Sequence, residues 1–278
     1  MSNEISIADP TIPVLTWDFE KVKDYVDSLR SQMRRQPVTE ETEASREGFN
    51  RIPALMSAFN LVQECLRKKR SYTRTTIQEK GKSVQVPRVV TVQERLGSTL
   101  NITNFFDGLG FLICAVDSNV HSRADDEEFA IWILKRYAHM CCVVHATFGP
   151  DTKAELKSED DGTKDKVKLP ACAMVMWGKM QGTLVTPANP IQTGQYAMSL
   201  SCSLPGYVAP EPPARGKGQY KTRACRIRKE KLTEQIKGLR QIKPTEKWDF
   251  GNCAETNPFI TYAPAALNLL MQTLIAII

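Results

Sequence analysis

A cysteine and a glutamate two residues apart, Cys253 and Glu255, are the residues in this sequence whose types and spacing best suit chemistry. A thiolate is a good zinc ligand, and a carboxylate beside a metal-bound water can carry a proton. A helix beginning here would favour both ionised groups at its N-terminal end. A structural interpretation needs no chemistry: Asn252 caps the helix, Cys253 packs in the core and Glu255 complements the helix dipole. Both interpretations predict that a helix starts at this segment.

The wider run from Trp248 to Phe259 resembles the Gly-Asn-Cys-Ala-Glu segment of deaminase-like proteins that are common in filamentous fungi. Those proteins belong to the cytidine-deaminase-like superfamily, and the similarity is concentrated in residues 246–260. The resemblance implies that Cys253 is a zinc ligand. It implies that Glu255 is the catalytic group that moves a proton from zinc-bound water to the leaving amine of a nucleobase or nucleotide.

The family pattern also expects a Cys-x-x-Cys pair on a second helix downstream, whereas residues 256–278 contain no cysteine or histidine. The remaining ligands would then have to come from upstream. The upstream candidates are Cys141, Cys142, Cys172, Cys202 and Cys225. The resemblance therefore implies a truncated or degenerate relative of the zinc-dependent deaminases, which would be an enzyme only if the zinc site is complete.

A basic stretch at 215–247 suggests a non-enzymatic alternative, a nucleic-acid-binding or protein-binding module. Clustered cations neutralise phosphates and release counterions. The candidate contacts are Arg223, Arg226, Arg228 and Lys229. Leu232, Ile236 and Leu239 give the same stretch an apolar stripe, so a solvated helix that docks on the core explains it as well. A third hypothesis is a helical interaction protein without a small-molecule site.

The segment from His139 to His145 contains two histidines and two cysteines, which are zinc-binding residue types. His139, Cys142 and His145 are three residues apart, a spacing that drifts around a helix. One short helix cannot close a tetrahedral site with them, and the apolar neighbours favour a buried helix with core thiols.

Composition indicates an ordinary globular protein: 278 residues, 42% hydrophobic and 24% charged, with a net charge of +6. This charge is too small to argue alone for nucleic acid. The eight cysteines are scattered, and the first residues show neither a basic nor an apolar signal region. We therefore expect reduced thiols and a cytoplasmic or nuclear location.

Periodicity predicts an α+β protein that is mainly helical, with a helical domain at 12–148 followed by a smaller mixed region with short strands at 169–278. The expected helices cover 15–35, 49–67, 100–116 with an interruption near Gly108, 124–148, and about 226–239. The expected strands cover 84–92, 171–177, 183–185 and 196–203, and 68–82 is expected to be a loop.

The segment 259–278 carries no charged residue and approaches the length of a membrane span. Two interpretations compete: a buried helix beginning after Pro264, and a C-terminal membrane anchor. Asn268, Gln272 and the absence of flanking lysine or arginine weaken the anchor. We favour the buried helix, so a membrane partner is not expected.

Overall fold

The computed structural model describes residues 5–35, 51–79, 81–93, 98–116, 127–148, 172–180, 196–204, 219–235, 254, 256–262 and 269–277. Its helices are η1 (Val14–Thr16), α1 (Phe19–Arg35), α2 (Arg51–Lys68), α3 (Phe105–Val116), α5 (Glu127–Thr147), α6 (Gln219–Gln235) and α7 (Thr256–Tyr262). Its strands are β1 (Arg74–Glu79), β2 (Lys82–Pro87), β3 (Val90–Gln93), β4 (Thr99–Ile102), β5 (Cys172–Met180), β6 (Tyr196–Cys202) and β7 (Leu269–Ile277). The mainly helical α+β prediction is confirmed.

The helical periodicity of the N-terminal half predicted its elements well. In α1 the residues at steps of three and four are buried, and Asp18 caps the helix by accepting a hydrogen bond from the Lys21 backbone N–H at 2.9 Å. Helices α2 and α5 lie close to the ranges that were expected. An apolar face at helical spacing was therefore a sufficient signal for these three helices.

The C-terminal prediction was wrong, because Leu269–Ile277 forms strand β7 and not a helix. Strand β7 pairs antiparallel with β5 from Cys172↔Ile277 to Met180↔Leu269. A short, uniformly apolar run fits a buried strand as well as a buried helix. The available edge of β5 decides between them, since pairing satisfies the backbone groups of β7 that point towards β5.

Two further segments also differ from expectation. Residues 68–82 are not a simple loop: β1 forms a hairpin with β2, in register from Arg74↔Pro87 to Glu79↔Lys82. Residues 100–116 split into β4 and an uninterrupted α3. Gly108 does not break that helix, and a Cβ there would come within 2.6 Å of Val62 Cγ2 on α2. That glycine therefore permits close packing of α2 on α3. Residues 183–185 lie outside the described part of the chain.

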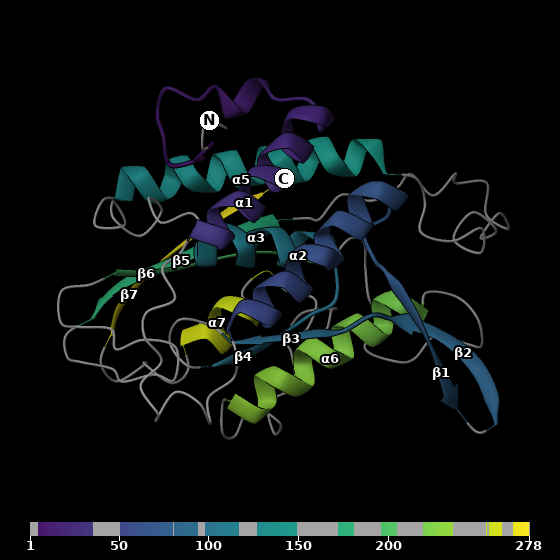
Figure 1. Ribbon diagram of the computed structural model, residues 1–278. Helices are drawn as coiled ribbons and strands as arrows, with labels where there is room; N and C mark the ends of the chain where they lie inside the picture. Colours follow the sequence, from purple (N-terminus) through teal and green to yellow (C-terminus); the bar gives the residue numbers. More distant parts are fainter. Residues whose placement is uncertain are drawn as a thin grey trace, which may run out of the picture.

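The side chains of strand β6 alternate between an apolar face and a polar face, and both faces are buried. Met198, Leu200 and Cys202 belong to the hydrophobic core, whereas Ser199 and Ser201, which alternate with them, meet polar groups. In the three-stranded sheet, ordered β6-β5-β7, the core side packs on α5, and α7 contacts β6. Figure 1 shows α5 on one side of the molecule and α6 on the other.

One hydrophobic core joins the two predicted regions. It includes Val26, Phe59 and Tyr137 from the N-terminal half, and Val175, Leu232 and Ile260 from the C-terminal half. No helix in the described part of the chain is long and apolar enough to cross a membrane.

Candidate functional site

The Gly-Asn-Cys-Ala-Glu segment directly precedes helix α7. Cys253 and Glu255 lie outside the described residues, but Ala254 between them is buried, and α7 begins at Thr256. The helix is anchored through Thr261: its Oγ1 donates to the Asn257 carbonyl at 3.0 Å, and its carbonyl accepts a hydrogen bond from Ser98 Oγ at 3.2 Å. A helix therefore follows the motif, but it begins at Thr256, whereas both interpretations of the sequence placed Cys253 and Glu255 in its first turn.

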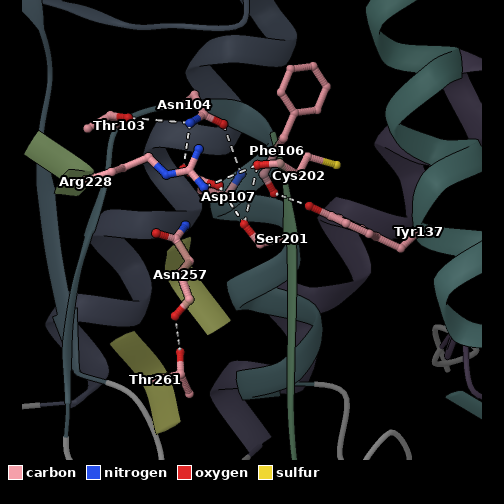
Figure 2. Close-up of polar contacts among 10 residues, drawn as sticks. All are labelled: Thr103, Asn104, Phe106, Asp107, Tyr137, Ser201, Cys202, Arg228, Asn257 and Thr261. Carbon is pink, nitrogen blue, oxygen red and sulfur yellow. Dashed lines mark hydrogen bonds and ion pairs between the residues drawn. The ribbon is translucent and has the colours of Figure 1, made fainter. Parts of the chain in front are cut away.

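A buried polar cluster lies beside α7, where α3, β6 and α6 meet (Figure 2). Its centre is Asp107, whose Oδ2 is 3.9 Å from Arg228 Nε on α6. Ser201 Oγ donates to Asp107 Oδ1 at 3.4 Å, and Arg228 Nη2 donates to the Cys202 carbonyl at 3.4 Å. The side chain of Asn257 points from α7 towards this cluster. The cluster thus ties α3, β6 and α6 together beside the helix that follows the motif.

Asn104 fixes the position of Asp107 at the start of α3. Its Oδ1 accepts the Asp107 backbone N–H at 3.0 Å, and its Nδ2 donates to Asp107 Oδ2 at 2.7 Å. Asn104 is therefore an N-cap residue that also binds the carboxylate three positions later; the carboxylate accepts from the side-chain amide and not, as in a capping box, from the N-cap backbone N–H. The negative charge of Asp107 also suits the positive end of the helix dipole.

The buried thiols nearest to this cluster belong to Cys202 on β6 and Cys141 on α5, whose sulfur atoms are 3.7 Å apart. Tyr137 lies beside them, and its hydroxyl donates to the Phe106 carbonyl at 2.9 Å. Burial raises the pKa of Cys141 and of Tyr137 well above their ordinary values. Both thiols belong to the hydrophobic core.

The donor set within the described residues does not fit a complete zinc site. No group of three or more His, Cys, Asp or Glu side chains in the described ranges converges on a point that could hold a metal. His139 Nε2 contacts the Trp17 carbonyl at 3.2 Å, whereas His145 packs against the Phe106 ring. The two histidines of α5 therefore face different surroundings.

The four predicted nucleic-acid contacts on α6 differ in exposure and in ion pairing. Arg226 is exposed and Lys229 half-buried. Arg223 is engaged with Glu79 on β1, with Nη2 2.7 Å from Oε2. Arg228 is only 1% exposed and holds Asp107, so it has to be removed from the predicted phosphate-contacting group. A guanidinium inside the core cannot meet a surface phosphate.

Sequence analysis missed two buried residues, Asp107 and Arg136. Arg136 on α5 donates to the carbonyls of Ile7, Asp9 and Ile12 and stacks on Trp132 with its Cζ 3.4 Å from the ring centroid. Asp107 follows an asparagine by three residues just before an apolar run, which is a capping signal that the sequence carried. The role of Arg136 had no such signal, because its partners are backbone carbonyls.

Comparisons with known proteins give no relative. No family model, no curated protein and no solved structure matches this chain.

Proposed function

We propose that this chain is a deaminase-like protein whose 251–255 segment retains one half of a zinc-deaminase site. In this proposal Cys253 is the metal-binding thiol and Glu255 is the proton-transferring carboxylate. The observation that carries it is the position of the motif: Ala254 is buried and α7 begins directly after the motif. The positive end of a helix favours an ionised thiolate and an ionised carboxylate in the residues that lead into it.

The other half of the site is degenerate in this proposal. A deaminase holds zinc with three protein ligands and leaves the fourth position for water. Cys141 and Cys202 are poor candidates to supply the missing ligands, because both belong to the hydrophobic core and, within the described residues, no group of three or more His, Cys, Asp or Glu side chains converges there. We therefore expect weak metal binding through Cys253 and no zinc-dependent turnover.

Cobalt titration tests the proposal, since Co²⁺ takes the same ligands as Zn²⁺ and gives a thiolate charge-transfer absorption. The wild type, Cys253→Ser and Cys114→Ser are titrated side by side. Cys114 lies in α3 and is not one of the candidate ligands, so its variant controls for the loss of any one thiol. We expect a weak thiolate–cobalt band that disappears in Cys253→Ser and remains in Cys114→Ser.

Two outcomes would contradict the proposal in different ways. Equal spectra for all three proteins would show that the motif does not bind metal. About one tightly held zinc per chain after a chelator rinse, lost in Cys253→Ser, would mean that the site is complete. In that case an assay for release of ammonia from nucleobases and nucleotides, with Glu255→Ala as the inactive control, would follow.

The second candidate function is nucleic-acid or acidic-partner binding through α6, for which the exposure of Arg226 is the favourable observation. With Arg228 inside the core and Arg223 paired, this surface keeps fewer available cations than its sequence suggests. Salt-sensitive binding that falls in Arg226→Gln/Lys229→Gln would support it.

A further inference from the structure

Basic side chains gather where α2 ends and the β1–β2 hairpin begins. They are Arg67, Lys68, Lys69, Arg70, Arg74 and Arg88, here called the basic cluster. The chain turns sharply at Lys69, whose φ is 51°, and the Arg70 N–H returns to the Cys65 carbonyl at 3.1 Å. This turn presents consecutive basic residues around the end of the helix.

The hairpin brings the other two cations to the same place. Arg74 stands opposite Pro87 in the strand register, and the backbone N–H of Arg88 donates to the Thr73 carbonyl at 2.9 Å. Arg88 Nη1 then reaches Glu64 Oε2 on α2 at 3.3 Å. The base of the hairpin and the end of α2 therefore form one surface.

The ion pairs of this surface leave it with an excess of positive charge. Glu64 is shared by Lys68 and Arg88, whose side chains remain 42% and 39% exposed. The hydrogen bond from Lys68 and the charges of Lys68, Arg88 and Arg67 lower the pKa of Glu64. Arg67 and Lys69 are exposed as well. Among the described residues of this surface, Glu64 thus pairs with Lys68 and Arg88, and Arg67 and Lys69 add exposed positive charge.

The hairpin itself is a polar ribbon at the edge of the molecule (Figure 1). The ribbon is tied to the protein where Glu79 pairs with Arg223 and β2 packs on α6, while every residue of β1 after Arg74 is exposed. Thr76 and Gln78 belong to the face opposite Glu79, because side chains alternate along a strand. Gln78 Nε2 donates to Ser83 Oγ at 2.8 Å, and both strands are exposed over their outer halves.

We propose that this surface binds double-stranded DNA, with the β1–β2 ribbon in the major groove and the basic cluster on the flanking phosphates. The major groove of B-DNA, about 12 Å wide, admits a two-stranded ribbon, and amide and hydroxyl side chains read base edges there. Phosphate contacts by exposed arginine and lysine supply affinity and position. The major groove of an RNA duplex is too narrow to be read in this way.

The test is fluorescence anisotropy of a labelled 20-base-pair DNA duplex of mixed sequence, titrated with the full chain at several salt concentrations. Arg67→Gln/Lys69→Gln removes two exposed cations from the basic cluster. Arg30→Gln/Lys135→Gln removes two exposed cations outside it, from α1 and α5. All three proteins are first shown to have the same circular dichroism spectrum and urea midpoint.

We expect the cluster variant to bind at least about tenfold more weakly at low salt, with a salt slope reduced by about 1.8, because each phosphate contact contributes about 0.9 to that slope. The control variant should stay within about twofold of wild type, as expected if only phosphate-contacting cations matter. Thr76→Ala/Gln78→Ala should weaken DNA binding without changing the salt slope.

The proposal is overturned if both charge variants behave alike, if an RNA duplex of the same sequence binds as tightly, or if anionic lipid vesicles bind and the DNA does not. It does not depend on Cys253 or on zinc, so failure of the metal-site proposal leaves it standing. The proposal is also contradicted if Arg226→Gln/Lys229→Gln loses the DNA affinity expected to be lost by the cluster variant while the cluster variant loses none. That result would place the DNA-binding surface on α6.

Discussion

Two buried arginines connect distant parts of this protein, and different partners compensate their charges. Arg228 brings α6 to the start of α3 through the carboxylate of Asp107. Arg136 holds the N-terminal segment on α5 by donating to the carbonyls of Ile7 and Asp9 at 2.8 Å and of Ile12 at 2.7 Å. One arginine therefore depends on another buried charge, and the other depends on backbone dipoles.

The difference determines what is lost when each arginine is removed. Without Arg228, Asp107 remains as a buried carboxylate, which costs much more than a missing hydrogen bond. Without Arg136, three carbonyls lose a donor, but water can replace it at the carbonyls of Asp9 and Ile12, whose contacts are only partly buried. Burial lowers the pKa of Arg136 to about 10, so it remains charged at neutral pH.

The largest expected effect is that of Arg228→Met, which should lower the free energy of unfolding by about 3–5 kcal/mol because the Asp107 carboxylate is left in the core without its cation. Urea unfolding followed by circular dichroism measures this. In the matched double variant Arg228→Met/Asp107→Asn, most of that loss should be recovered. A double variant as unstable as the single one would show that the pair matters by packing and not by charge.

Gly110→Ala should cost about 1–3 kcal/mol by overpacking. A Cβ at Gly110 would press on the backbone carbonyl of Leu200 in β6, which cannot rotate away. Because α3 carries Asp107, moving it from β6 loosens the Arg228 region and leaves the Arg136 region intact. Hydrogen exchange should therefore quicken in β6 and α6 but not in residues 5–17; quickening confined to 5–17 would contradict this division.

Arg136→Gln should have a smaller and more local effect, about 1–2 kcal/mol, since hydrogen bonds are lost but no buried charge is left behind. Residues 5–17 should exchange their amide hydrogens faster while the core keeps its protection. Arg136→Lys serves as the control that keeps the charge but cannot reach three carbonyls at once. If Arg136→Gln instead lost protection from exchange throughout the protein, Arg136 would stabilise the whole fold, as is expected of Arg228.

Sequence predicted the elements better than the contacts between them. Helices α1, α2 and α5 were expected because an apolar stripe records a local periodicity. The burial of Arg228 was not expected, because α6 is basic throughout and its one inward arginine is selected by Asp107, which lies 121 positions earlier in the sequence. The same limit explains β7, whose conformation depends on the edge of β5.

In the candidate site, too, the sequence predicted local structure better than the contacts between distant segments. A helix with Asn252 as its N-cap and Glu255 in its first turn was predicted from local capping and dipole arguments, whereas α7 begins at Thr256. The cluster beside it, formed by α3, β6 and α6, could not be predicted, because three segments far apart in sequence have to meet before its residues acquire their partners.

The smallest effect on stability is expected for an exposed ion pair, that of Glu64 with Lys68 and Arg88. Glu64→Gln should change stability by at most about 1 kcal/mol at neutral pH, since solvent screens the attraction of Lys68 and Arg88. The folded-state pKa of Glu64 is lowered, first by the hydrogen bond from Lys68, so its contribution is present above the ordinary value of 4.5 and is lost as the pH falls through the folded value. The melting temperatures of wild type and Glu64→Gln should therefore differ slightly at pH 7 and converge at acidic pH. A difference in melting temperature that persists after Glu64 is protonated would mean that hydrogen bonding, and not charge, stabilises this surface pair. The Glu64 pair and the buried Arg228–Asp107 pair would then differ in solvent exposure alone.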